Sequence, residues 1–238
     1  MKEIIFTNTV EPSFRKYYDK INGTKNINKY NKYSLVDSIY HDISNNILLY
    51  MTENIEIADD IIKKELDKRF ILDDFTWKIC LTKEDFLFNN PFTLDDIIFM
   101  PRAYINKNIK NRVELIKTLI HEYLHISQRI KNDIWNKYIT ENLKNWIILD
   151  YKIDDNLIND NYILNPDTYE YNRSFLYNKN NKLYYGRYEY HGGLEIYWYE
   201  YINNKFIRTN NRIHEYEHPY EEMAYVLSEN LDNILNLI

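Results

Sequence analysis

The strongest constraint on the fold is a helical segment that carries two histidines four residues apart. His121, Glu122 and His125 belong to the pentapeptide HEYLH, and Asn111, followed three residues later by Glu114, is typical of a helix N-terminus. Apolar residues recur at helical spacing through the segment, at Val113, Ile116, Ile120 and Leu124. We therefore predict an amphipathic helix of four or five turns, with one buried stripe and the pentapeptide near its end.

This spacing suits a metal ion. Residues four apart lie on one face of a helix, so the imidazoles of His121 and His125 can bind the same ion. Glu122 is offset from that pair and can reach a water molecule beside the metal. The pattern predicts one zinc ion per chain, with Glu122 as the base. The competing interpretation is a surface helix that carries these side chains by coincidence.

A catalytic zinc ion usually has three protein ligands and one open position. The third is not a histidine six residues beyond His125, because that position is Lys131. The C-terminal segment offers a better candidate. Glu221, Ala224, Tyr225 and Ser228 share one helical face, and its two small residues permit close approach to the first helix. We predict Glu221 as the third ligand and Tyr225 as a hydrogen-bond partner of a ligand.

Other residues remain candidates for the third ligand. Glu222 is the next choice, although it shares a face with Glu229 that is expected to be more solvated. His191, His214 and His218 follow, each of which is also explained as a loop or turn histidine. His41 is interpreted as a structural or surface residue.

These residues resemble the gluzincin group of zinc metallopeptidases. In that group a glutamate on a later helix is the third ligand, in the pattern E-x-x-[AS]-[DNY], and residues 221–225 read EEMAY. The resemblance covers residues 74–130 and 215–238. It implies His121, His125 and Glu221 as the zinc ligands and Glu122 as the general base. It also implies hydrolysis of a protein or peptide substrate.

The resemblance has two further implications. The strand before the metal helix, predicted at residues 95–100, would be an edge strand on which an extended substrate lies. The chain is also similar to uncharacterised H-E-x-x-H proteins of large DNA viruses, whose pattern continues into Gln-Arg, as Gln128-Arg129 does here.

The periodicity of the rest of the chain predicts an α+β fold. We expect a single metallopeptidase-like domain over residues 1–238, in four parts. These are a helical N-terminal region (1–72), a small sheet with the metal helix (73–130), an inserted helix and antiparallel β-meander (131–214), and the third-ligand helix (215–238). Further helices are predicted at residues 34–50, 54–70, 133–149 and 219–237, and strands at 75–81 and 95–100.

The β-meander is predicted from an aromatic segment at residues 169–209. Hairpin turns are expected at Asn180-Asn181, Gly192-Gly193 and Asn203-Asn204. The meander is interpreted either as a sheet held by aromatic cross-strand pairs or as a substrate-facing surface. The sequence leaves the donor that would stabilise an oxyanion open among Tyr220, Tyr225, His191 and His214.

Composition restricts the partners and the compartment. The net charge is −6, and 30 basic residues are interspersed among 36 acidic ones, so neither nucleic acid nor a membrane is an expected partner. Cys80 is the single cysteine and lies in an apolar run, which predicts a buried strand residue. The first residues lack the apolar core of a signal peptide, and no apolar run approaches membrane-spanning length, so a cytoplasmic location is expected.

Two alternative functions fit the same sequence. A non-catalytic protein could be stabilised by zinc and bind a partner through the aromatic meander. A purely structural or interaction protein would hold no metal. The first alternative differs from a peptidase in the fourth zinc position, which would be closed to solvent. The second predicts that His121→Ala and His125→Ala leave stability and partner binding intact.

Overall fold

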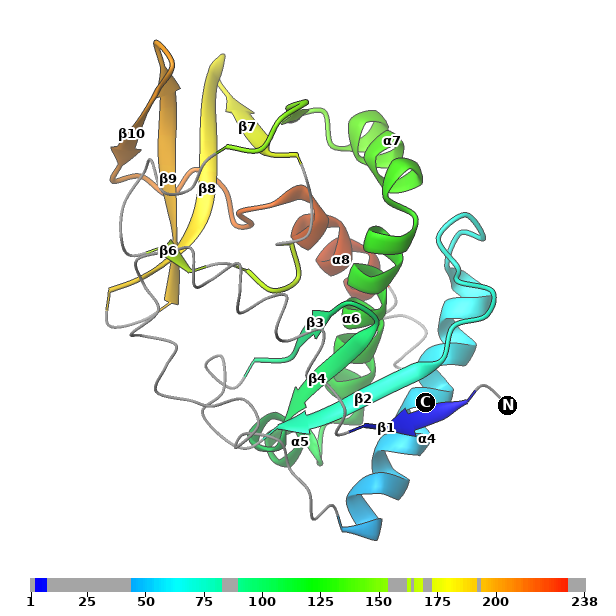
Figure 1. The fold of residues 1–238 in the computed structure, drawn as a ribbon. Helices are drawn as coiled ribbons and strands as arrows, with labels where there is room; N and C mark the ends of the chain where they lie inside the picture. The colour runs from blue at the N-terminus through cyan, green and yellow to red at the C-terminus, as the bar shows by residue number, and fades with distance from the viewer. Residues whose placement is uncertain are drawn as a thin grey trace.

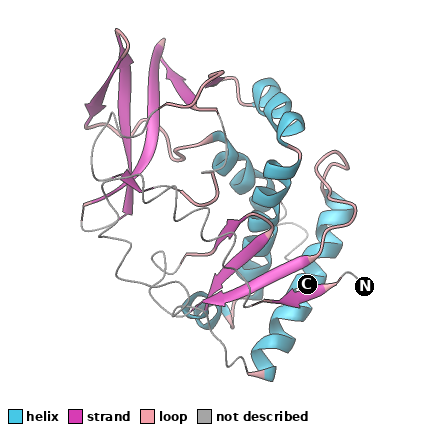
Figure 2. Ribbon diagram, in the orientation of Figure 1, coloured by secondary structure: helices cyan, strands magenta, loops and turns pink. Residues whose placement is uncertain are grey.

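The computed structural model describes residues 3–7, 44–82, 90–153, 162–163, 165–168, 173–191 and 194–230. Within these ranges the chain is an α+β protein with five helices, a mixed four-stranded sheet and a separate antiparallel sheet (Figures 1 and 2). The helices are α4 (Asn45–Glu65), α5 (Arg102–Asn108), α6 (Arg112–Ile130), α7 (Asn132–Asn142) and α8 (Pro219–Glu229). Figure 1 shows α8 beside α6, on the side of α6 that faces the antiparallel sheet.

The mixed sheet has the strand order β1-β2-β4-β3. Its strands are β1 (Ile4–Phe6), β2 (Trp77–Thr82), β3 (Phe92–Leu94) and β4 (Ile97–Pro101). β1 and β4 pair with β2 in parallel, and β3 pairs with β4 antiparallel. The predicted strand at 75–81 is therefore present as β2. Cys80 is fully buried in it, as predicted, and burial raises the pKa of its thiol to about 12.

The prediction for residues 95–100 is partly wrong. Asp95 has a positive φ of 49° and forms a two-residue turn with Asp96, so β4 begins only at Ile97. β4 also lies between β2 and β3, which excludes it as the edge strand. That position belongs to β3. β3 was not predicted, because its three residues are too few to show a periodic pattern.

The predicted helix that carries the pentapeptide forms, as α6. The side chain of Asn111 accepts a hydrogen bond from Glu114 N and so satisfies one of the free N–H groups at the start of α6. Ile116, Ile120 and Leu124 are buried, and Val113 packs at the margin of the same core. This core joins α6 to α4, β2 and β4. The pentapeptide is therefore held on a helix that is packed along most of its length.

Three other predicted helices differ from the structure at their ends. α4 runs from residue 45 to 65 and joins parts of the two helices expected at 34–50 and 54–70; residues 34–43 lie outside the described ranges. α7 ends at Asn142 rather than at residue 149. Trp146–Ile148 instead form β5, because Ile147 pairs with Leu176, a contact that local periodicity does not reveal. α8 begins at Pro219, as predicted, but ends at Glu229, with Asn230 as its C-cap, rather than at residue 237.

The aromatic segment forms the predicted antiparallel meander. Its strands are β7 (Phe175–Lys179), β8 (Lys182–Tyr190), β9 (Leu194–Ile202) and β10 (Lys205–Thr209), in the order β10-β9-β8-β7-β5. A short strand β6 (Tyr162–Ile163) also pairs with β8. The turns at Asn180-Asn181 and Asn203-Asn204 have positive φ at both residues, as a two-residue hairpin with a type I′ turn requires.

Several sequence-based expectations concern residues outside the described ranges. These are His41, the Gly192-Gly193 turn, residues 169–172 at the start of the meander, and residues 231–237 at the end of the last helix. Among the helices that the structure describes, none combines the length and the apolar character needed to span a bilayer.

Candidate metal centre

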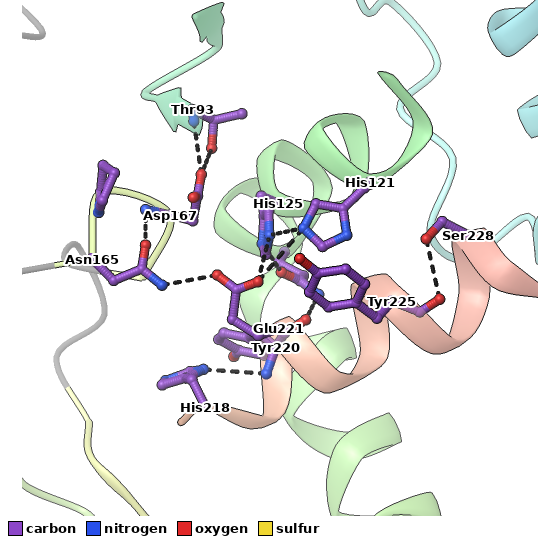
Figure 3. A network of polar contacts seen from close by, with 12 residues as sticks. Thr93, His121, His125, Asn165, Asp167, His218, Tyr220, Glu221, Tyr225 and Ser228 are labelled. Carbon is purple, nitrogen blue, oxygen red and sulfur yellow. Dashed lines mark hydrogen bonds and ion pairs between the residues drawn. The ribbon is translucent and has the colours of Figure 1, made fainter. Parts of the chain in front are cut away.

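The structure brings His121, His125 and Glu221 together. The two histidines lie one turn apart on α6, and Glu221 lies in the first turn of α8, which crosses α6 at this point (Figure 3). His125 Nε2 is 3.0 Å from His121 Nε2 and 3.4 Å from Glu221 Oε2, and His121 Nε2 is 3.5 Å from the same oxygen. In the described ranges, these three residues form the group whose donor atoms converge closely enough to hold a metal ion.

The spacing of these donor atoms fits zinc. Three ligand atoms arranged tetrahedrally around zinc, at ordinary bond lengths, lie about 3.3 Å from one another. The three observed separations, 3.0, 3.4 and 3.5 Å, bracket that value. Two imidazole nitrogens and one carboxylate oxygen are also ligands that zinc accepts. The residues present are therefore suited to a zinc ion.

Close packing of the two helices places Glu221 within reach. Ala224 and Ser228, on the same face of α8, are both buried, which agrees with the prediction that small residues permit close approach. Pro219 occupies the first turn of α8, and the side chain of His218 accepts a hydrogen bond from Tyr220 N. The start of α8, and with it Glu221, is thereby fixed.

Gln128 orients His125. The amide nitrogen of Gln128 donates to the carbonyl oxygen of Tyr220 at 3.0 Å, which turns the amide oxygen toward His125 Nδ1 at 2.9 Å. His125 Nδ1 therefore carries the proton and donates it to that oxygen. In the neutral ring the lone pair is then on Nε2, which faces His121 and Glu221. This contact presents His125 as a metal ligand and also ties α6 to α8.

The charges of the site favour a bound cation. Burial alone would lower the pKa of His125, but the carboxylates of Glu221 and Asp167 raise it to about 10. Burial alone would raise the pKa of Glu221, but His125 and hydrogen bonds from both histidines hold it well below its usual range. In the metal-free protein His125 is therefore cationic beside an anionic Glu221. A metal ion that binds here displaces the proton of His125.

Asn165 holds the other oxygen of Glu221. Its amide nitrogen donates to Glu221 Oε1 at 2.8 Å and to Glu217 Oε1 at 2.7 Å, which leaves Glu221 Oε2 for the histidines (Figure 3). Burial, and then the charge of Glu221, raises the pKa of Glu217 to about 8, so that Glu217 is largely protonated at neutral pH. The two buried carboxyl groups can therefore share one amide group without strong repulsion.

Glu122 lies beside the three donors. Its side chain is buried, and its Oε2 has no hydrogen-bond partner among the described residues. Burial, and then the charge of Asp167, raises its pKa well above the usual range for a glutamate. A buried carboxylate with an unused oxygen beside a metal position is suited to accept a proton from water.

A cavity of about 320 Å³ connects these groups. His121, Glu122 and Glu221 line it, together with residues 90–92, residues 165–167, and parts of α5, α6 and α8. The meander contributes Tyr188 from β8 and Leu194 from β9. One end of the aromatic sheet therefore forms a wall of the site. This supports the substrate-facing interpretation of the meander for that end.

Several of the other predicted residues lie away from the three donor atoms. Glu222 points away from the donors, where it accepts hydrogen bonds from Trp146 and His214, each at 2.7 Å. His191 contacts Glu189 within the meander. The hydroxyl of Tyr220 donates to Asn136, outside the cavity.

Tyr225 does line the cavity, and its ring centroid lies 4.4 Å from that of His121. Tyr188 also lines the cavity and was not identified from the sequence. The charge of Glu217 and burial raise the pKa of Tyr188, and burial raises the pKa of Tyr225. Both phenol groups are therefore protonated at neutral pH. Both can therefore donate a hydrogen bond into the cavity.

Three other residues of the site were also missed. Asn165, Asp167 and Glu217 lie in segments without helical or strand periodicity, and no metal-binding or catalytic pattern includes them. They lie near His125 only because the tertiary fold brings the turn after β6 and the segment before α8 close to α6. Gln128 was noted as part of the Gln128-Arg129 pair and was given no role at the site.

Comparison with known proteins adds no family assignment. No family model, curated protein or solved structure matches the chain significantly. What the structure itself provides is a buried His-His-Glu group on two packed helices that can hold a metal ion.

Proposed function

We propose that the protein is a zinc-dependent hydrolase of peptide bonds, of the gluzincin type, with a zincin-like arrangement of its sheet and two ligand helices. The observation that carries the proposal is the convergence of His121, His125 and Glu221 on one point beside Glu122, at the wall of a cavity of about 320 Å³. Three protein ligands and an open side are the usual arrangement of a catalytic zinc ion, whereas structural sites have four protein ligands.

The zinc ligands in this proposal are His121 Nε2, His125 Nε2 and Glu221 Oε2. Bound zinc would polarise the carbonyl group of the substrate and lower the pKa of water at the open position. Gln128 keeps the lone pair of His125 directed at the site, and Asn165 keeps Glu221 Oε2 turned inward. These two contacts fix the ligands before a substrate arrives, which is what rapid catalysis requires.

Glu122 is the proposed general base. It accepts a proton from the attacking water and delivers that proton to the leaving amine as the C–N bond breaks. Its raised pKa makes it a stronger proton acceptor than a solvated glutamate. The hydroxyl groups of Tyr225 and Tyr188 are the candidates to donate a hydrogen bond to the oxygen on which negative charge develops.

Metal analysis of the purified protein is the first test. We expect about one zinc ion per chain in the wild type, lost in Glu221→Ala and kept in Glu222→Ala. Glu222 is the matched control because it neighbours Glu221 but binds Trp146 and His214 instead. Loss of zinc in both variants, or in neither, would contradict the ligand assignment.

Glu122→Gln tests the chemistry separately from metal binding. We expect this variant to keep its zinc and to hydrolyse a mixed peptide library about 10²–10⁴-fold more slowly, since the amide cannot accept the proton. Products would be identified by mass spectrometry. Hydrolysis at the wild-type rate in the variant would exclude Glu122 as the base.

The alternative function is a non-catalytic protein stabilised by zinc. It is favoured by the position of the three donors, which join two core helices at a point where His125 is fully buried. The two functions differ in access to the metal. A catalytic zinc ion would bind a small hydroxamate competitively with substrate, and a purely structural one would not.

A further inference from the structure

The edge strand beside the site has its outward hydrogen-bonding groups occupied. Thr93 is the central residue of β3, and its N–H and C=O point away from β4. Thr93 N donates to Asp167 Oδ1 at 2.7 Å, and the hydroxyl of Thr93 donates to the same oxygen at 2.7 Å (Figure 3). Pro91, two residues earlier, has no N–H to offer. An extended peptide laid along β3 would find its natural donors already used or missing.

Arg129 occupies the acceptors of the same edge. Its guanidinium group, from the last turn of α6, donates to Thr93 O and to Asp95 O, each at 3.0 Å. It also contacts the carbonyl oxygens of Pro166 and Asp167 at 3.4 and 3.3 Å. One side chain thus fastens the edge of β3 to residues 165–168, a turn that we call the strap.

The strap is also fastened on the other side of the site. Asn165, at its start, donates to Glu221 Oε1 on α8, and Asn165 Oδ1 accepts a hydrogen bond from Asp167 N at 2.9 Å within the strap itself. The strap therefore runs from the α8 ligand to the edge of β3, and residues 165–167 line the cavity. The bonds at both ends involve side chains that are buried.

The geometry points to a substrate class. We infer that the site acts on short peptides and small amides, held by the cavity itself, and not on extended polypeptide paired with β3. Pairing with an exposed strand is the general way in which an extended peptide is bound by its backbone. Here that edge is closed by Asp167 and Arg129. The cavity, at about 320 Å³, is also at the small end of the range for ligand sites.

This inference rests on the proposed hydrolase function and refines it. It corrects the expectation that an extended substrate lies on residues 95–100, since neither β4, which is an interior strand, nor β3, whose edge is closed, can pair with one. It also gives Asp167 a positioning role, through the backbone of Thr93.

A length series of substrates tests the inference. The zinc-loaded wild type is given dipeptides and octapeptides that contain the same scissile bond. At an open edge, two additional backbone hydrogen bonds would raise kcat/KM about tenfold or more. We expect a smaller gain than this in the wild type. A gain of about tenfold or more with length would overturn the inference while leaving the hydrolase function in place.

Two substitutions at one position isolate the role of the strap. Asp167→Ala frees Thr93 N while Arg129 still occupies Thr93 O, so one backbone hydrogen bond becomes available, and we expect a preference for octapeptides over dipeptides about fivefold above that of the wild type. Asp167→Asn removes the same charge near Glu122 but keeps an oxygen that accepts from Thr93, so it should retain the length dependence of the wild type. Asp96→Ala, which removes a half-exposed carboxylate paired with Lys78, controls for charge loss nearby. No gain with length in Asp167→Ala would overturn the inference.

Amide hydrogen exchange gives a readout that does not require activity. Thr93 N–H should exchange slowly in the wild type and in Asp167→Asn, and faster in Asp167→Ala. If no peptide is hydrolysed but this pattern is found, the closed edge stands and the hydrolase proposal fails. Equal exchange at Thr93 in all three proteins would show that the edge is not closed by Asp167. Should Asp167→Ala not fold, the wild type and Asp167→Asn still decide through their length dependence.

Discussion

The candidate metal centre depends on the orientation of one buried imidazole. His125 is fully buried between α6 and α8, where its ring has no solvent to replace a lost partner. Its Nδ1 depends on Gln128 Oε1, and Gln128 in turn depends on the carbonyl group of Tyr220. Partners of this kind fix the ring tautomer and raise the basicity of the ligand.

Substitution of Gln128 therefore tests how the orientation of His125 affects metal affinity, while all three ligand side chains stay in place. Gln128→Ala removes the acceptor for His125 Nδ1 and should weaken zinc binding about 10–100-fold, measured by competition with a chelating dye. Gln128→Glu keeps an acceptor for His125 Nδ1 but loses the donor to Tyr220 O, so its zinc affinity should fall between those of the wild type and Gln128→Ala. Equal affinity in all three proteins would show that Gln128 does not orient the ligand.

The residues of the site differ in how far the sequence identifies them. His121, Glu122 and His125 are recognisable because helical geometry places them together within five positions. Glu221 is recognisable because its face of α8 carries small residues that permit close helix packing. Asn165 and Asp167 could not be inferred, since their partners Glu221 and Thr93 are more than 50 positions away along the chain.

At the level of elements, the start of α8 depends on a histidine that must stay neutral. His218 Nδ1 accepts a hydrogen bond from Tyr220 N, and its ring packs on Phe175 with the centroids 4.5 Å apart. Burial lowers its pKa to about 3, against the opposing charge of Glu221 and with smaller contributions from His125 and Lys152. Protonation would remove the lone pair that holds the helix N-terminus.

This predicts a pH dependence of stability that belongs to His218. In the unfolded chain a histidine takes up a proton near pH 6.5, whereas His218 in the folded protein remains unprotonated until about pH 3. Its contribution is therefore lost as the pH falls below 6.5. The loss between pH 7 and pH 5 is about 2 kcal/mol.

The measurement compares urea unfolding of the wild type with that of His218→Asn at the two pH values. Asparagine keeps an N-cap acceptor but does not titrate. The variant should lose about 2 kcal/mol less than the wild type on acidification, whatever its stability at pH 7. Parallel losses in both proteins would mean that another group causes the acid sensitivity.

The meander packs closely against the segment that precedes α8. A Cβ atom added at Gly186 in β8 would lie 2.9 Å from Trp198 Cη2 and 3.0 Å from Glu217 Cα. Trp198 is buried and a backbone atom cannot turn aside, so Gly186→Ala should cost about 1–3 kcal/mol of unfolding free energy. Ile207→Ala, at an exposed position on β10, should cost far less. Similar urea midpoints for the two variants would contradict the close approach.

Helices and strands, like the residues of the site, could be predicted from the sequence only where the pattern is local. α6, β2 and the β7–β10 meander were predictable because each carries enough residues, or a clear turn, to show its period. β1, β3 and β5 have three residues each and exist only through pairing with distant strands. The edge strand was consequently assigned to the wrong segment. The expected single domain with an inserted meander remains a prediction.

For the whole molecule, the candidate metal centre lies where the two halves of the described fold meet. α6 packs with α4 and the mixed sheet, whereas α8 follows the meander directly in the chain. His121 and His125 belong to the first half and Glu221 to the second. A metal ion bound by all three therefore joins two parts of the chain that are about 100 positions apart in sequence.

Removal of zinc should therefore lower the melting temperature of the whole protein. When free zinc exceeds its Kd about a hundredfold, binding to the folded state adds about 2.7 kcal/mol, which for a chain of this size raises Tm by about 5–10 °C. The measurement is a thermal scan with added zinc and with excess chelator, on the wild type, Glu221→Ala and Glu222→Ala. The zinc-dependent shift in Tm should disappear in Glu221→Ala. It should persist in Glu222→Ala, even if the Tm of this control without zinc is lower than that of the wild type. The same shift in Glu221→Ala would mean that zinc stabilises the fold from a site that does not include this carboxylate.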